Sequence, residues 1–465
     1  MEVNSPVETQ VTNVILTPHH LPQGMSPGAM GGSQKPKEYD ITDLVVGIDL
    51  NESLFTRIMT GDILITDGVG LLSGIPIMGQ EKITFTIHKG HINTEHKEWT
   101  LDLTFYVRAV ENVSVGNDFT MTYQLRIVEE AFYLNALQIV SQSYTGTVSD
   151  IMKEIYDEYL KSPSKPEQTI TCDEPTAGLF KCIIPSWSPY AALKWLNRRA
   201  RSETNDPFFL YNTLFDGMQL KSAKTLFDEM PLNDRTLYMQ KEHVPESPSE
   251  VRKGDVLDTQ HKVDMAFYFE ILETTPVPTH ILNSAYGANY KLLDTSSKTM
   301  EEKIWNYSDE FDALPKLSKH KVASDEKLWE TSTGEQKRIS DYVSNEDVYA
   351  FSKSAYESDT EMSFNEDVLN NIPYRNAVQR HIGNFAYKLG IPGDKEIQVG
   401  RTINLYINKN EIINIDDADK IKDHRKSGKH IITMIKHRFH LPKMQYTQMI
   451  EVNRDTMERP HADEN

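Results

Sequence analysis

The first chemistry that the sequence suggests is phosphate binding, in the stretch DILITDGVGLLSG at residues 62–74. An apolar strand runs into Gly68, Gly70 and Gly74, as at the start of a dinucleotide-binding loop. The glycines are spaced G-x-G-x-x-x-G, one residue longer than the G-x-G-x-x-G of that loop. Residues 75–87 then read as a turn and a second strand, not as a helix whose amides could face a pyrophosphate. We therefore predict a glycine-rich β-connection and no nucleotide site.

Histidines are the next candidates, because His88, His91 and His96 lie close together. They fall in a glycine-containing loop between two expected strands, with no cysteine beside them and no regular spacing. We expect loop side chains instead of metal ligands. His437 and His440 fall on opposite faces of an expected strand, so they cannot hold one ion together and are expected to serve packing or surface roles.

An acidic segment, NIDDADKIKDH at residues 414–424, carries the oxygen ligands that calcium prefers. A calcium loop also needs a glycine in its middle and a glutamate at its end, and this segment has neither. We interpret it as a solvated loop. The clustered side chains are Asp416, Asp417, Asp419, Asp423 and His424.

Covalent catalysis has no candidate of comparable strength. No G-x-S-x-G stretch occurs. Cys172 and Cys182 flank a turn, and cysteines in such a context are more often buried thiols than nucleophiles. Two carboxylates could cleave a glycosidic bond across a cleft, but among 68 acidic residues such pairs arise by chance. We predict that the protein is not an enzyme and has no catalytic, cofactor-binding or metal-binding residues.

The composition sets wider bounds. The chain of 465 residues is long enough for about two to four domains. Its net charge of −19 argues against general binding of nucleic acids or anionic membranes, and suits a soluble protein or the lining of a conduit for a polyanion. Two cysteines without a C-x-x-C pair indicate synthesis in a reducing cytoplasm. We expect neither a secretory signal nor a membrane-spanning helix, because no run of about 18 apolar residues occurs.

The spacing of apolar residues predicts a β-rich chain. From residue 43 to 128, apolar and polar residues alternate, as in antiparallel strands with one buried face. A short helix is expected within this region at residues 52–59. The alternation returns near the C-terminus, at residues 402–407, 430–440 and 446–455.

Between these regions, residues 129–205 change to helical spacing. Thr147 and Asp150 form a capping box before one helix, and Ser188 with Pro189 begins a second. We further expect a hairpin and helical turn at 207–227, a β or short helical run at 263–272, and mostly solvated loops and short helices at 296–370.

Several stretches, taken in order, resemble the baseplate hub proteins of contractile-tailed bacteriophages. They cover most of residues 40–455, and the resemblance is to hubs without a fused lysozyme or needle. The stretches are ESLFTRIMTGDILITDGVGLLSGIPIMGQEKITFTI, SQSYTGTVSDIMKEIYDEYL, IIPSWSPYAALKWLNRRA followed by PFFLYNTLFDGMQLKSAKTL, SAYGANYKLLDTSSKTMEEKIWNY, and VGRTINLYI with SGKHIITMIKHRFH and YTQMIEVNRD.

The resemblance implies structural work in a virion tail, after assembly in the host cytoplasm. Such hubs form a homotrimer at the tip of the tail tube, around the channel for DNA during genome ejection. Each chain carries two tube-type antiparallel β-barrels, so three chains match a six-fold tube to a three-fold central spike. The implied partners are the spike, the tube and other baseplate (wedge) proteins, with no cofactor and no membrane insertion.

The implied fold is mainly β with helical insertions (α+β): two tube-type antiparallel β-barrel domains plus smaller α/β subdomains. The resemblance does not extend to the N-terminal arm at residues 1–37 or to the acidic stretch at 341–367. The expected parts are a flexible N-terminal arm at 1–37, a first barrel at 38–130, a helix-containing middle at 131–230, a second β and irregular region with acidic loops at 231–370, and a C-terminal β-domain at 371–465.

Two alternatives to the hub remain open. A tail-associated cell-wall hydrolase would need a cleft with a carboxylate of raised pKa and would clear peptidoglycan in a zymogram. Another tail structural protein, such as one that binds the host receptor, would bind cells as an isolated trimer. The hub hypothesis predicts neither activity, but a trimer or a monomer that trimerises only on its spike.

Overall fold

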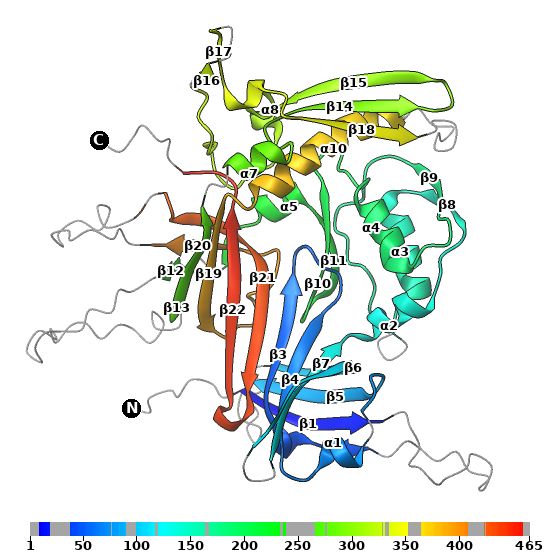
Figure 1. Cartoon of the computed structure of the whole chain (residues 1–465), viewed down its shortest axis with the longest axis vertical. Coiled ribbons are helices and arrows are strands. Elements are labelled where there is room, and N and C mark those ends of the chain that lie inside the picture. The colour runs from blue at the N-terminus through cyan, green and yellow to red at the C-terminus, as the bar shows by residue number, and fades with distance from the viewer. Residues whose placement is uncertain are drawn as a thin grey trace, which may run out of the picture.

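The computed structural model shows a chain built mainly of antiparallel strands with helical insertions, as predicted. Figure 1 shows a tall central sheet, a helical unit on one side and a smaller sheet with helices above it. The structure describes residues 9–18, 38–75, 77–89, 99–116, 120–162, 167–232, 236–238, 266–274, 277–327, 329–330, 334–351, 364–407, 423 and 425–458.

The central sheet contains thirteen of the described strands, and the main path runs β13-β19-β22-β21-β3-β4-β7-β6-β5-β1-β2. β20 pairs with β21, and β12 pairs with β20 in the sheet's parallel contact. The strands are β1 (Thr9–Thr17), β2 (Tyr39–Asp40), β3 (Val45–Ser53), β4 (Thr60–Asp67), β5 (Lys82–Lys89), β6 (Trp99–Val115), β7 (Met121–Val128), β12 (Thr236–Tyr238), β13 (Tyr268–Thr274), β19 (Phe385–Pro392), β20 (Thr402–Tyr406), β21 (Gly428–His440) and β22 (Gln445–Arg454).

This sheet differs from the predicted pair of closed barrels. The described strands form an open path, and pairing of β3 with β21 joins the N-terminal half to the C-terminal half in one surface. The N-terminal half curves back toward that junction, so that the start of β1 meets the turn between β21 and β22. There the backbone N–H of Thr9 donates to the carbonyl of Met444 at 3.0 Å. Each half nevertheless packs its own apolar core, and Phe439 and Tyr446 of the β21–β22 hairpin lie in the N-terminal core.

The alternation predicted for residues 43–128 is confirmed. Along β5, buried Ile83, Phe85 and Ile87 alternate with more accessible residues, and β3, β4 and β7 follow the same rule. One face of each strand therefore supplies the N-terminal core, as expected for antiparallel strands covered on one side.

Two predictions in this half are wrong. Residues 9–17, assigned to the flexible arm at 1–37, form β1 and pair along β5, because their alternating apolar side chains fill the same core. The rest of that arm lies outside the described residues, apart from Pro18. Residues 52–59 do not form a helix: Glu52 and Ser53 complete β3, and a turn leads to β4.

The middle unit packs helices against two hairpins. Thr147 caps α3 by accepting a hydrogen bond from the backbone N–H of Asp150 at 3.2 Å, and Ser188 with Pro189 begins α4, so both predicted starts are confirmed. The predicted hairpin and helical turn at 207–227 are also present. The elements are α2 (Glu130–Leu137), β8 (Ser143–Gly146), α3 (Val148–Tyr159), β9 (Phe180–Ile183), α4 (Pro189–Asn197), β10 (Phe208–Thr213), β11 (Gly217–Ser222) and α5 (Ala223–Asp228).

An upper layer corrects the expectation of mostly solvated loops at 296–370. β15 and β18 flank β14, and the inner face of this sheet buries Tyr290, Leu292 and Trp305 beside α10 (Figure 1). The elements are α7 (Val277–Leu282), β14 (Gly287–Asp294), β15 (Thr299–Asn306), α8 (Tyr307–Glu310), β16 (Trp329–Glu330), β17 (Gln336–Lys337), β18 (Asn345–Phe351) and α10 (Phe364–His381). The first part of the acidic stretch at 341–367 forms β18, and residues 352–363 lie outside the described part.

A buried imidazole at the end of α10 gives the fold a dependence on pH. His381 stacks on Tyr307 with ring centroids 3.9 Å apart, and burial followed by the neighbouring His280 lowers the pKa of His381 to about 3. The unfolded chain binds this proton near pH 6.5, so the contribution of neutral His381 to stability is lost as pH falls below about 6.5. Asp455 acts in the opposite direction between about pH 4 and 6, because burial raises its pKa to about 6.

We expect His381→Gln to weaken this acid sensitivity. Between about pH 7 and about pH 4.5, the free energy of unfolding should fall by about 2–3 kcal/mol less in the variant than in the unchanged protein. Denaturant unfolding at the two pH values measures the difference, and comparing slopes cancels the cost of the lost stacking. Equal losses in both proteins would show that His381 is not held neutral by the fold.

Candidate interaction surfaces

The glycine-rich stretch after β4 has its backbone amides occupied by a side chain of the chain itself. The Asp67 carboxylate accepts the N–H of Val69 at 2.9 Å and of Leu72 at 3.1 Å, where a short helix, α1 (Leu71–Gly74), begins. Burial opposes ionisation of Asp67, but amides from Leu71, Leu72 and their neighbours outweigh it and lower the pKa. The predicted turn and following strand are confirmed, and Asp67 fills the position that a phosphate would take.

The other sequence candidates are spread through the fold. The His88 ring, on β5, lies 3.0 Å from the hydroxyl of Thr100 and 3.2 Å from that of Thr12, so it joins three strands. His91, His96 and most of the 414–424 segment lie outside the described residues. Within the described part of the chain, no group of three or more His, Cys, Asp or Glu side chains is arranged to hold a metal ion.

The two thiols are protonated groups at their sites. Cys182 is buried, and burial raises its pKa to about 11. Cys172 is half-buried; burial also raises its pKa, and its thiol donates to the carbonyl of Glu174 at 3.0 Å. Since the thiolate is the nucleophilic form, neither site favours covalent catalysis.

A buried contact that the sequence analysis missed joins the two halves of the sheet. The β3–β21 register places Glu52 and His437 diagonally on one face, with the Glu52 carboxylate 3.0 Å from His437 Nε2 but not aligned as a hydrogen bond. The backbone N–H of Leu214, from the turn between β10 and β11, donates to the same carboxylate, and the Tyr446 hydroxyl lies 2.8 Å from His437 Nδ1. Both side chains of the pair are fully buried, so the contact is structural.

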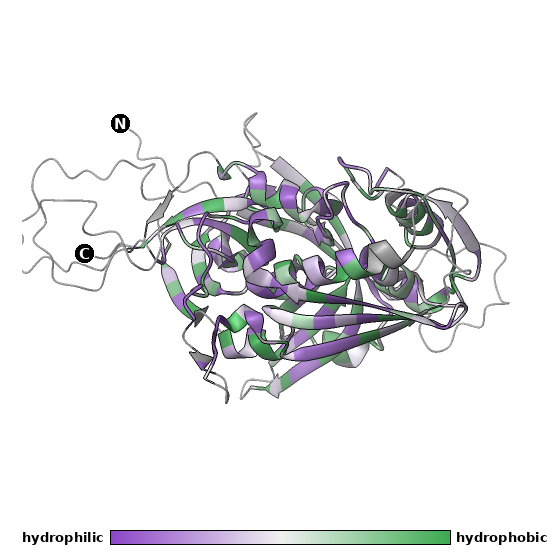
Figure 2. Ribbon diagram, turned by 90° about the horizontal axis from the view of Figure 1, so that it is seen from above, coloured by the Kyte–Doolittle hydropathy of each residue, from purple (hydrophilic) through white to green (hydrophobic). Residues whose placement is uncertain are grey.

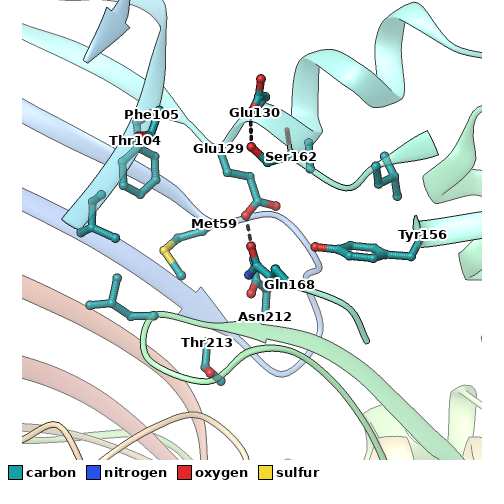
Figure 3. A pocket seen from close by; sticks show the side chains of 14 residues that line it. Met59, Thr104, Phe105, Glu129, Glu130, Tyr156, Ser162, Gln168, Asn212 and Thr213 are labelled. Atoms are coloured by element: carbon teal, nitrogen blue, oxygen red, sulfur yellow. Dashed lines mark hydrogen bonds between the residues drawn. The ribbon is translucent and has the colours of Figure 1, made fainter. Parts of the chain in front are cut away.

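A small cavity of about 70 Å³ lies where α2, β10 and the N-terminal sheet meet (Figure 3). The Glu129 carboxylate accepts the Asn212 amide at 2.6 Å and the Tyr190 hydroxyl at 3.2 Å. Glu130 accepts the hydroxyls of Ser162 and of Tyr106, the latter at 3.2 Å. Burial, then Glu130, raises the pKa of Tyr106 to about 12. Both carboxylates are held by protein donors, and the space suits a few water molecules at most, so the cavity acts as a polar joint between units.

In contrast to these buried polar sites, exposed apolar side chains gather in three places on the surface. Figure 2 shows hydrophobic residues, in green, alternating with hydrophilic ones along strands that lie at the surface. The edge patch lies on and before the sheet's edge strand β13, with Phe267 61% and Ile271 47% exposed. The outer-face patch lies on the side of the upper sheet that points away from α10, and the tip patch lies beside the tip of the β6–β7 hairpin. The edge patch is Phe267, Tyr268, Ile271 and Leu272; the outer-face patch is Leu293, Met300, Ile304 and Val348; the tip patch is Val69, Val113 and Val115.

Clusters of exposed apolar side chains are common on surfaces that another protein covers. An edge strand is a second such signal, because its free N–H and C=O groups can pair with another chain. The exposed apolar side chains and the edge strand together point to binding of protein, so the candidate site of this chain is a set of interfaces. Among the described residues, no helix is long and apolar enough to cross a membrane.

Three solved structures illustrate what the chain is similar to. The tail protein from Neisseria meningitidis MC58 matches with 9% identity over 96% of this chain and 97% of its own, at a TM-score of 0.48. The 43 kDa tail protein of prophage MuSo2 from Shewanella oneidensis matches with 11% identity over 97% and 100%, at a TM-score of 0.47. A chain of the phage P2 baseplate in its activated conformation matches with 10% identity over 98% and 100%, at a TM-score of 0.27.

No protein-family model matches the chain, and no curated protein matches it. The three solved structures are a tail protein, a prophage tail protein and a chain of a phage baseplate.

Proposed function

We propose that this chain is a structural hub of a phage tail baseplate, working as a homotrimer between a six-fold tail tube and a three-fold central spike. The observation that carries the proposal is the order of five resembling stretches along residues 40–455, together with a sheet built as two halves around separate cores. Each half of the sheet is proposed to act as one tube-building module. Three chains then present six modules to the six-fold tail tube. The three copies of the upper unit and of the middle unit lie outside this ring of modules.

The β3–β21 junction supports this use of the two halves. A ring of six modules needs a fixed angle between the two in each chain, and a continuous ladder of backbone hydrogen bonds supplies it. The buried Glu52–His437 contact lies on the same two strands. The halves are therefore linked both by backbone hydrogen bonds and by side-chain contacts. This favours a rigid pair of modules over two modules joined by a flexible linker.

The edge patch is the surface proposed to meet the next copy. Among the described strands, β13 ends the sheet, and a neighbouring chain's strand could continue the ladder there while the apolar side chains of β13 are covered. Obligate interfaces bury roughly 2,000–5,000 Å² or more, so the outer-face or tip patch would add contacts to tube, spike or wedge proteins. The acidic balance of the chain, −19 overall, suits a channel that DNA passes without adhering.

The test is the position and copy number of the chain in intact tails, with Ile271→Glu as the structural probe. Three labelled copies at the centre of the tube tip are expected, and Ile271→Glu is expected to remove the chain from assembled tails while its unfolding free energy changes by less than about 0.5 kcal/mol. Met230→Glu, at an exposed methionine outside the three patches, should assemble normally. Peripheral density of six or more copies would contradict the hub, and normal assembly of Ile271→Glu would contradict the edge patch as an interface.

A further inference from the structure

A second cavity, of about 380 Å³, is lined by five cationic side chains and, among the described residues, by no acidic one. It lies where the turn after β3, the end of α4, the start of β10 and the middle of α10 meet. This concentration of positive charge stands out in a chain whose net charge is −19. The five residues, called the basic cluster below, are Arg57, Lys194, Arg198, Arg375 and Arg380.

The basic cluster has no compensating carboxylate within the described part of the chain. None of its five members forms an ion pair there, whereas Arg126, Arg338 and Arg438 on the surface all do. The Nε of Arg57 is buried and lacks a hydrogen-bond partner among the described residues. A buried guanidinium N–H without a partner is costly, so Arg57 can take an acceptor that the described residues do not supply.

One member of the cluster has a structural explanation. Arg375 Nη1 donates to the carbonyls of Asn197, at 2.9 Å, and Phe208, at 3.3 Å, and so satisfies the C-terminal end of α4. A helix C-terminus offers only about half a negative charge, which cannot balance five cations. Burial, and then Arg57 and Arg198, lower the pKa of Arg375 to about 10, so the cluster is held together against its own repulsion.

We propose that the basic cluster binds a multivalent oxyanion of the phosphate type. Guanidinium groups bind the oxygens of phosphate in parallel pairs of charge-assisted hydrogen bonds, and a divalent anion offsets more of the repulsion than a single carboxylate. Arg57 supplies the unsatisfied donor, while Arg198 and Arg380 are exposed enough to close over an entering anion. Because the cavity touches the sheet, the middle unit and α10, a bound phosphate would tie three parts of the chain together.

Titration calorimetry of the full chain with inorganic phosphate, in chloride buffer at constant ionic strength, tests the proposal. Arg57→Gln is expected to weaken phosphate binding at least ten-fold, since it removes a charge-assisted contact. Arg380→Gln, at an exposed side chain that can be changed without loss of folding, is expected to weaken binding several-fold. Arg438→Gln removes the same charge from an exposed arginine on β21 and should leave binding unchanged.

Three results would overturn the proposal. Phosphate binding could be absent at constant ionic strength, or it could fall equally in Arg438→Gln, which would indicate general attraction to positive charge. Citrate could bind as tightly as phosphate, which would assign the cluster to carboxylates of a protein partner. The measurement does not depend on the chain being a hub, so its failure leaves the proposed function standing.

Discussion

Replacing Glu52 by alanine should lower the free energy of unfolding by about 3–5 kcal/mol, the range expected when one partner is removed from a fully buried polar contact of this kind. The Glu52 carboxylate contacts His437 at 3.0 Å and also accepts the backbone N–H of Leu214, and both would lose a partner inside the core. Because these groups come from β3, β21 and the β10–β11 turn, the loss loosens three segments together.

Chemical denaturation of the purified chain measures this effect. Asp49→Ala is the matched control, because it removes a carboxylate from the same strand whose partners, Arg438 and Lys436, lie at the surface, and it should cost less than about 1 kcal/mol. If Glu52→Ala costs no more than Asp49→Ala, the buried contact contributes nothing to joining the two halves. A double-mutant cycle with His437→Ala would then separate the carboxylate–imidazole contact from the bond to Leu214.

Trp305→Ala should cost about 3–5 kcal/mol, as expected when a large aromatic side chain is removed from a packed core. Trp305 is the largest fully buried side chain among the described residues and stands edge-on to Tyr374 of α10, with ring centroids 5.1 Å apart. It packs between the upper sheet and that helix, so a cavity there should loosen the upper layer.

The neighbouring residue provides the control for this prediction. Ile304 lies on the opposite face of β15 and is 67% exposed, so Ile304→Ala should change the free energy of unfolding by less than about 0.5 kcal/mol. Hydrogen exchange of β14 and β15 locates the damage, which should be confined to the upper layer in Trp305→Ala. Comparable costs for the two variants would mean that Trp305 does not anchor the layer.

Local patterns predicted the local elements well. The capping box at Thr147 and the Ser188–Pro189 start are chosen by residues within one turn of the helix, and a strand with one buried face states its period directly. These features need no partner elsewhere in the chain. The fold class and most strands of the central sheet were therefore accessible from the sequence.

The errors arose where distant residues decide the outcome. Residues 9–17 become a strand only because β5 offers them an edge, and Glu52 is drawn into β3 by its pairing with β21 near the other end of the chain. Within residues 296–370 the upper sheet was hidden because β15 is mostly exposed and carries Glu301, Glu302 and Lys303 before the buried Trp305. The charged residues of the outer face and the apolar residues of the inner face together give a polar composition, and such a composition is typical of a solvated loop.

The contacts proposed to matter for function are of the same distant kind. The basic cluster draws one arginine from a turn, cations from α4 and two arginines from α10, and no spacing in the sequence links them. The apolar patches are visible only once the register shows which residues share a face. Candidate chemistry read from short motifs therefore pointed to loops, whereas the structure concentrates unusual environments at junctions.

Because Phe439 and Tyr446 complete the N-terminal core, that core can finish folding only after the C-terminal hairpin has been synthesised. The ribosome releases β3 with an unoccupied edge and an unfilled core long before the hairpin that completes both is synthesised. Such late, long-range closure makes folding slow and leaves early segments prone to stray pairing. A chain that ends before the β21–β22 hairpin would lack Phe439 and Tyr446, and its N-terminal core would stay incomplete.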